Sequence, residues 1–260
     1  SIAAGNHPRH SQTMAGKSFF ESRNPMINEE SISKISAQDG YLSGETMSID
    51  GAINKTLILF SILVVTSSIS FLMPSTFLMI VGAIGGFIAV LVASFKPHTS
   101  PIAAPVYTAL EGLFVGSISA IYASQVQGIV LNAIALTFGT LLLMLVLYKY
   151  RIITVTDKLR SGIIIATGGI ALVYLIAFIF QLFGYNVPYI HEGGLMGIGF
   201  SLLVIAIAAL NLLLDFDNFE KAEQFRSPKY MEWFCAMGLM VTLVWLYIEF
   251  LRLLSKLNRD

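Results

Sequence analysis

The chain has 260 residues, of which 55% are hydrophobic and only 12% charged, and its formal net charge is zero. Because a soluble domain carries about 25% charged residues, this composition argues against a soluble protein and favours a bundle embedded in a bilayer. The balanced charge provides no basic face for nucleic acid, and the single cysteine, Cys235, cannot form an intrachain disulfide.

We expect residues 1–50 to form a polar, disordered N-terminal tail, because they are rich in Ser, Asn and Glu and lack sustained apolar periodicity. Met14 resembles a native start, so residues 1–13 can be vector-derived. Residues 51–260 are expected to form one membrane domain.

Seven apolar runs follow one another from Lys55 onward. A helix needs about 20 apolar residues to cross the hydrocarbon core of a bilayer. We therefore predict an all-α integral membrane protein with seven transmembrane helices over residues 55–73, 77–95, 102–123, 127–149, 162–183, 195–215 and 230–254.

The Lys and Arg residues of the loops predict the orientation. The loops after spans two, four and six contain Lys and Arg, whereas those after spans one, three and five contain none. This asymmetry predicts a cytoplasmic N-terminus. Seven crossings put the C-terminus outside, where Arg252, Lys256 and Arg259 oppose the rule. Either packing holds the last helix despite these charges, or the helix does not fully cross.

Acidic side chains inside apolar runs are costly and usually mark ion or proton paths. Glu111 lies near mid-membrane, about 14 Å along its helix from Ile102. Tyr107 and Thr108, one turn earlier, are placed to hydrogen-bond its carboxyl. The alternative is a protonated carboxyl satisfied by a neighbouring helix. Glu111 is also a rival partner for Asp215.

Asp215 closes the sixth apolar run, and Asn211, one turn earlier on the same face, is placed to orient its carboxylate. Asp217 points to a different face and lies four residues before Lys221, a spacing that suits a solvated salt bridge. Solvation of the helix end is the alternative interpretation for both acids.

Glu249 lies in the last apolar run, three residues before Arg252, so the two can form an intrahelical ion pair. The alternative is that Glu249, Arg252 and Lys256 form the solvated end of the last helix. Glu249 lies about 29 Å along the helix from Tyr230, which argues against contact with Asp215 unless the first turns stand in the cytoplasm.

The sequence contains no GxSxG or HExxH motif and no nucleotide, haem or zinc signature. We therefore expect no enzymatic activity and no cofactor, with calcium only as a transported ion.

Several segments resemble the Bax inhibitor-1 (TMBIM) family, most closely its bacterial YccA-like branch. They cover residues 46–51 with 54–56, 109–116, 210–217, 228–233 and 241–254. The resemblance implies that the last helix lies at the centre of two three-helix layers.

The resemblance also implies a pH-sensitive calcium leak governed by an acidic pair. Asp215 matches the sixth-helix aspartate, and Glu249 matches the seventh-helix aspartate of the Leu-Tyr-Leu-Asp type, so calcium is expected near these two residues. Two departures from the family pattern bear on whether Asp215 and Glu249 pair directly. The seventh-helix acid here is Glu, and the stretch between the acids is longer than in the family pattern.

The leading hypothesis is a pH-gated cation (calcium) leak channel whose paired carboxyls share a proton at low pH and separate when both ionise. The alternative is a non-conducting regulator whose polar tail binds a membrane protease or stress-response partner. In either case we expect a monomer or weak oligomer in the bacterial cytoplasmic (inner) membrane. Its partners are then the lipid bilayer and, for a regulator, another membrane protein, with no nucleic acid.

Overall fold

The computed structural model describes residues 45–183 and 194–258. Within these ranges, seven helices are long and apolar enough to cross a membrane, as the sequence predicts. They are α2 (Ile49–Leu72), α3 (Thr76–Phe95), α4 (Ser100–Gln125), α5 (Ile129–Lys149), α6 (Asp157–Leu182), α7 (Leu195–Gln224) and α8 (Met231–Leu257), with a short 3-10 helix, η1 (Pro97–Thr99), before α4. The predictions for residues 1–44, including the vector-derived segment, lie outside the described residues.

Hydroxyl side chains define where several helices begin. Ser48 Oγ accepts a hydrogen bond of 3.0 Å from the backbone N–H of Gly51 at the start of α2. Thr156 Oγ1 accepts one of 3.2 Å from Leu159 at the start of α6. These bonds satisfy N–H groups that have no partner within the helix. Because α2 begins at Ile49, the folded domain starts earlier than the predicted boundary at residue 51.

Helix α7 continues to Gln224, well past the predicted end at residue 215. The sequence prediction ended the span where the acids begin. Of those acids, Asp217 is paired with Arg160 of α6 and Glu220 with Arg151, which follows α5, while Asp215 packs against α8, as described below. The polar turns therefore stay inside the bundle.

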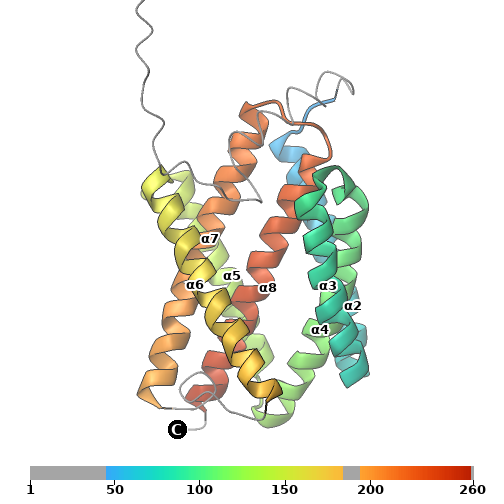
Figure 1. Ribbon diagram of the computed structural model, residues 1–260, viewed down its shortest axis with the longest axis vertical. Coiled ribbons are helices and arrows are strands. Elements are labelled where there is room, and N and C mark those ends of the chain that lie inside the picture. Colours follow the sequence, from blue (N-terminus) through green and yellow to red (C-terminus); the bar gives the residue numbers. More distant parts are fainter. Residues whose placement is uncertain (1–44, 184–193, 259–260) are drawn as a thin grey trace, which may run out of the picture.

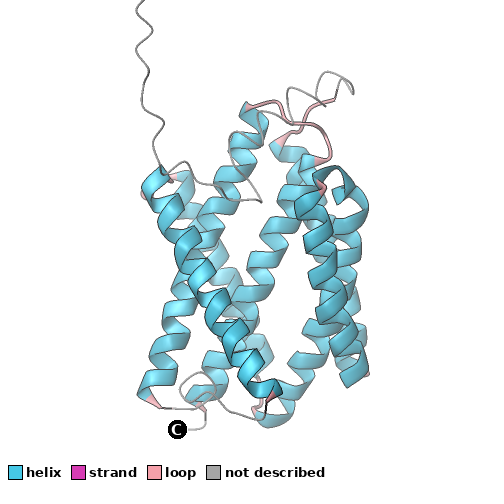
Figure 2. Cartoon of the chain, in the orientation of Figure 1, coloured by secondary structure: helices cyan, strands magenta, loops and turns pink. Residues whose placement is uncertain are grey.

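Two three-helix layers enclose α8 (Figure 1). Helices α2, α3 and α4 form one layer, α5, α6 and α7 form the other, and α8 packs against α2, α4, α5 and α7. This arrangement confirms the one implied by the family resemblance. Helix α8 is buried along almost its whole length, and short loops join the helices at both ends of the bundle (Figure 2).

The two ends of the bundle differ in charge. We call the end that carries residues 96–99, 150–156 and 225–230 the basic end, because the loop Lys and Arg residues lie there; it is at the top of Figure 1. The opposite end, where α8 finishes, is called the far end.

Glycines bring the helices of the first layer into backbone contact. A Cβ added at Gly82 of α3 would lie 2.5 Å from the carbonyl oxygen of Leu110 on α4. A Cβ at Gly116 of α4 would meet the carbonyl oxygen of Ser67 and lie 2.9 Å from the backbone nitrogen of Phe71, both on α2. These glycines belong to GxxxG pairs, which allow close approach of helices in lipid.

Candidate functional site

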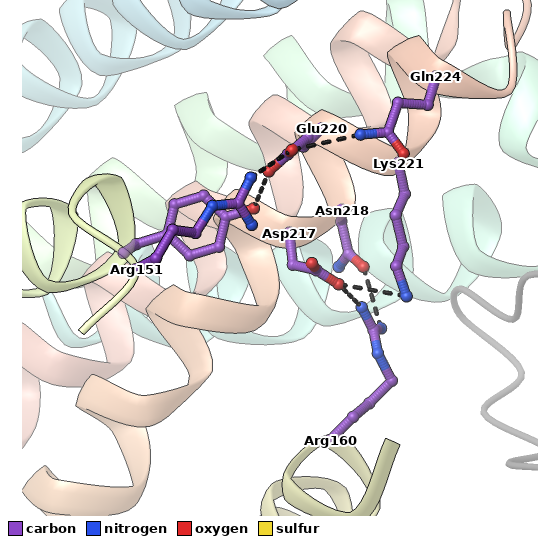
Figure 3. A network of polar contacts seen from close by, with 8 residues as sticks. Arg151, Arg160, Asp217, Asn218, Glu220, Lys221 and Gln224 are labelled. Carbon is purple, nitrogen blue, oxygen red and sulfur yellow. Dashed lines mark hydrogen bonds and ion pairs between the residues drawn. The ribbon is translucent and has the colours of Figure 1, made fainter. Parts of the chain in front are cut away.

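A buried ionic cluster ties α6 to α7 at the basic end (Figure 3). Asp217 of α7 pairs with the Arg160 guanidinium of α6 and lies 3.4 Å from Lys221 Nζ. Arg160 also donates a 3.1 Å hydrogen bond to Asn218 Oδ1. The predicted Asp217–Lys221 pair is therefore confirmed. Its predicted solvation is wrong, because Arg160 covers the Asp217 carboxylate and leaves the residue only 8% exposed.

A second polar cluster ties α5 to the same end of α7. Glu220 Oε1 accepts a 2.7 Å bond from Arg151, which follows α5, and a 3.2 Å bond from Gln224. Tyr148 of α5 donates to the other Glu220 oxygen. In Figure 3, Arg151 and Arg160 approach α7 from different sides. The last turns of α7 are thus held by both neighbouring helices.

Deeper in the bundle, Asn211 of α7 joins α6. Its Nδ2 donates hydrogen bonds of 2.8 Å to Thr167 Oγ1 and to the Ile207 carbonyl oxygen. The prediction that Asn211 orients Asp215 is therefore wrong. Both amide hydrogens are used on other partners, since Asn211 faces α6 whereas Asp215 faces α8.

Asp215 lies between α7 and the central helix. A Cβ added at Gly238 of α8 would lie 3.7 Å from Asp215 Oδ1, and Thr242, one turn further along the same face of α8, also neighbours the Asp215 carboxyl. Within the described ranges, the buried Oδ2 of Asp215 has no hydrogen-bond partner. The acid is therefore enclosed at a helix interface rather than solvated at a helix end.

Glu249 of α8 is the centre of a cluster near the far end. Its Oε1 accepts 2.8 Å hydrogen bonds from Tyr174 of α6 and from Arg252, which confirms the predicted intrahelical pair. The Arg252 guanidinium lies 5.0 Å from the centre of the Tyr174 ring. Glu249 is 1% exposed, so its interpretation as part of a solvated helix end is wrong.

The positively charged side chains near the end of the last helix also have partners inside the bundle. Lys256 Nζ donates 2.9 Å hydrogen bonds to the Gly197 carbonyl oxygen and to Ser201 Oγ, both on α7. Helix α8 runs the length of the bundle with Arg252 and Lys256 paired in this way. Both positive charges therefore have partners within the bundle, and full crossing of the membrane by α8 stays a prediction.

The α6 residues of these clusters form one stripe. Arg160, Thr167 and Tyr174 recur every seven residues, so they share a face and span about 21 Å. The buried apolar residues of α6 between and beyond them, Ile163, Ile170 and Ala177, have the same spacing. This is the seam pattern of a coiled coil. This stripe is not among the features predicted from the sequence, although the seven-residue recurrence of polar side chains is a signal for it.

We call this set of residues the polar column: Arg160, Thr167 and Tyr174 of α6, with Asn211, Asp215 and Asp217 of α7 and Glu249 of α8. It runs along α6, through its contacts with α7 and with the central helix, from the basic end toward the far end. Three of the acids singled out from the sequence belong to it.

Asp215 and Glu249 lie at different depths in the column. Asp215 is level with Gly238, and the eleven residues from Gly238 to Glu249 rise about 16 Å along α8. At about 100° per residue these two positions share a face. The acids therefore line the same side of α8 three turns apart and cannot share one ion. In the described part of the chain, no group of three or more His, Cys, Asp or Glu side chains is placed to hold a metal.

Glu111 lies outside the column. Its carboxyl packs over Gly86 of α3, where an added Cβ would lie 2.7 Å from Glu111 Oε2 and 3.7 Å from the Tyr107 ring. Thr108 donates its hydroxyl hydrogen to the Ala104 carbonyl oxygen at 2.8 Å, so its predicted bond to Glu111 is wrong. Since Glu111 faces α3, it is not a rival partner for Asp215.

A fifth enclosed acid, Glu232 at the start of α8, was not singled out from the sequence. Its Oε1 accepts bonds of 3.2 and 3.3 Å from the N–H and hydroxyl of Ser48, and Lys229 lies 3.3 Å away. Gly51 packs directly on this carboxylate.

The backbone before α2 adds further contacts with the α7–α8 loop. The N–H of Met47 donates to the Ser227 carbonyl oxygen at 2.7 Å, and Thr46 forms a bridge with Pro228. We call residues 46–51, docked in this way, the N-terminal latch. It joins the chain that precedes α2 to the start of the central helix.

These features define a polytopic membrane protein whose central helix is lined by buried carboxyls. Comparison with family models gives one that is described as Bax inhibitor 1 like and matches residues 12–259. The chain therefore belongs to the Bax inhibitor 1-like family. A search of curated proteins and a search of solved structures each return no match.

Proposed function

We propose that the protein is a pH-sensitive cation leak channel, with calcium as the transported ion, the polar column as its path and Asp215 as its sensor. In this proposal the protein catalyses no reaction, and the acids that matter are Asp215, which faces the central helix, and Glu249, which lies on it.

The observation that carries the proposal is the Asp215 carboxyl. It sits between α7 and α8, and among the described residues its Oδ2 has no hydrogen-bond partner. An ionised carboxylate with such an oxygen is costly inside a bundle, whereas the protonated form loses less solvation. Protonation of Asp215 therefore stabilises the α7–α8 contact, and ionisation weakens it.

Glu249 has a different part in this mechanism. Its Oε1 is paired with Arg252 and accepts a hydrogen bond from Tyr174, so its charge is compensated although its Oε2, among the described residues, has no partner. With about 16 Å between their levels on α8, the two acids do not exchange one proton directly. We propose that Glu249 anchors α6 to α8 while Asp215 changes charge, so that α7 separates from α8 along the column as the pH rises.

Flux measurements in liposomes test this mechanism. Purified protein is reconstituted with a trapped calcium dye, and flux is measured from acidic to neutral pH. We expect the flux to rise with pH in the wild type and to stay low at every pH in Asp215→Asn, which mimics the protonated form. Glu111→Gln is the matched control, because Glu111 lies outside the column and its loss leaves the pH profile unchanged. Absent wild-type flux, or an unchanged profile in Asp215→Asn, contradicts the proposal.

The N-terminal latch supports a second candidate, a non-conducting regulator that binds a membrane protease or stress-response partner. The latch joins the polar segment that precedes α2 to Glu232 of the central helix. Binding of a partner to that segment would then act on α8. Deletion of residues 1–44 distinguishes the candidates: a regulator loses its partner, whereas a channel keeps its flux.

We further propose that the basic end and the N-terminus face the cytoplasm of a bacterial cell, with the domain in the inner membrane. The loop Lys and Arg residues support this orientation. Reporter fusions at either end of the chain test it: a cytoplasmic reporter is expected to be active at the N-terminus and inactive at the C-terminus.

A further inference from the structure

A cavity of about 540 Å³ lies between α2, α4, α5 and α8, within the range of about 300–1,000 Å³ typical of small-molecule sites. Its walls include the second half of α2, from Phe60 to Leu72, and the first half of α5, from Val130 to Phe138. Both stretches belong to the far half of the bundle. The cavity therefore occupies the half of the membrane domain opposite the basic end.

The walls offer hydrocarbon rather than hydrogen-bond donors. Ser119 donates to the Val115 carbonyl oxygen at 2.6 Å, so the Tyr247 hydroxyl is left to donate to Ser119 Oγ at 2.7 Å. Thr137 donates to the Ala133 carbonyl oxygen at 2.8 Å. These hydroxyl groups thus donate their hydrogen bonds to other protein atoms and not into the cavity. The remaining lining is dominated by aliphatic and aromatic side chains.

The cavity opens sideways into the lipid-facing surface. Leu72 is 79% exposed, Val64 44% and Phe138 38%, and all three belong both to the lining and to membrane-spanning helices. A molecule entering by this route comes from the hydrocarbon core. Water is disfavoured in an apolar cavity, and an empty cavity loses dispersion contacts along its walls. Both effects favour an apolar occupant.

We infer that this cavity is a binding site for one acyl chain of a membrane phospholipid from the far-end leaflet. The chain fills the space between α2 and α5, while its headgroup stays at the far-end rim of the bundle. The inference is independent of the proposed ion path.

The site lies against the central helix on the side opposite the polar column. At about 100° per residue, the lining residues Met240, Leu243, Val244 and Tyr247 project away from the face of Gly238, Thr242 and Glu249. The bound chain therefore supports the apolar face of α8 over the depths that lie between Asp215 and Glu249 on its other face.

Photolabelling tests the site directly. Full-length protein is placed in phosphatidylglycerol–phosphatidylethanolamine nanodiscs that contain a phospholipid with a diazirine in one acyl chain. After illumination, adducts are mapped by mass spectrometry. We expect several-fold more label on the cavity walls of α2, α5 and α8 than on the exposed α6 positions Ile165 and Leu175. Equal labelling of both surfaces overturns the inference, and this comparison uses the wild type alone.

A pair of variants sharpens the result. Ile134→Trp fills the cavity from an exposed lining position, whereas Ile165→Trp adds the same bulk to the exposed face of α6. Only Ile134→Trp should abolish the enrichment of label. Native mass spectrometry after detergent extraction should show one phospholipid retained by the wild type and by Ile165→Trp. The assignment is contradicted if the wild type retains only free fatty acid or detergent. It is also contradicted if Ile134→Trp retains phospholipid as the wild type does.

Discussion

The two layers around the central helix are held together by different forces. In the α2–α3–α4 layer, Gly82 and Gly116 put the backbones of neighbouring helices in contact. In the α5–α6–α7 layer, α6 packs chiefly on α7 and is joined to its neighbours through the side chains of Arg160, Thr167 and Tyr174. Backbone contacts cannot be exchanged without separating the helices, whereas hydrogen bonds and ion pairs can be remade with water or another partner. We therefore expect the α2–α3–α4 layer to be the rigid part and the α5–α6–α7 layer the adjustable part.

The largest expected effect comes from Gly116→Leu. A side chain there meets the backbone of α2 at Ser67 and Phe71, which cannot yield. We expect the free energy of unfolding to fall by more than about 3 kcal/mol, measured by thermal or SDS denaturation in micelles. Gly139→Leu is the control, because a Cβ at Gly139 has no neighbour within 4 Å in the described structure. Similar losses in both variants would show that backbone contact is not what holds the first layer.

Arg160→Met should have the next largest effect. It leaves the buried Asp217 with Lys221 alone, and we expect a loss of about 3 kcal/mol, at the low end of the range for a broken buried pair. The double variant Arg160→Met, Asp217→Leu should recover most of this stability, because no unpaired charge remains. A double variant as unstable as the single one would contradict an ionic origin of the α6–α7 contact.

Tyr174→Phe removes one hydrogen bond to Glu249 and keeps the ring beneath Arg252. Since the acceptor is charged, we expect a loss of about 1.5 kcal/mol in the same denaturation assay. Tyr150→Phe is the control, because Tyr150 is exposed outside the helices of the column. If both variants are as stable as the wild type, the far-end cluster does not hold α6.

Thr167→Val should have the smallest effect. It removes the acceptor of the Asn211 bond within the membrane, where such bonds contribute about 0.6 kcal/mol on average. The same change at Thr140, whose exposed hydroxyl bonds only within α5, should alter stability less. A loss at Thr167 larger than that of Tyr174→Phe would reverse the order of contacts proposed along α6.

The sequence predicts those features that depend on one helix at a time. The apolar runs give the seven spans, and spacings of three and four residues predict the Glu249–Arg252 and Asp217–Lys221 pairs, because neighbours on one helix need no knowledge of the fold. Partners between helices depend on how each helix rotates and slides against the next. Asn211 was therefore assigned to Asp215 although it bonds to Thr167.

Burial was also underestimated for the acids near helix ends. Asp217 and Glu249 were given a solvated alternative, since both lie near the ends of apolar runs. The structure covers them with Arg160 and Tyr174 of α6. A helix with polar residues at seven-residue intervals can bring such partners into the bundle, and this signal is visible in the sequence of residues 160–177.

The position of α8 has a consequence for biosynthesis. Because chains are made from the N-terminus, the helix that fills the centre of the bundle is made after the other six described membrane helices. Until it arrives, the layers lack their shared core, and the Asp215 carboxyl lacks the Gly238–Thr242 surface that encloses it. Assembly of the bundle therefore waits for residues 231–257 to be made. A chain truncated before residue 231 would leave two half-built layers in the membrane, which makes it a substrate for quality control rather than a smaller version of the protein.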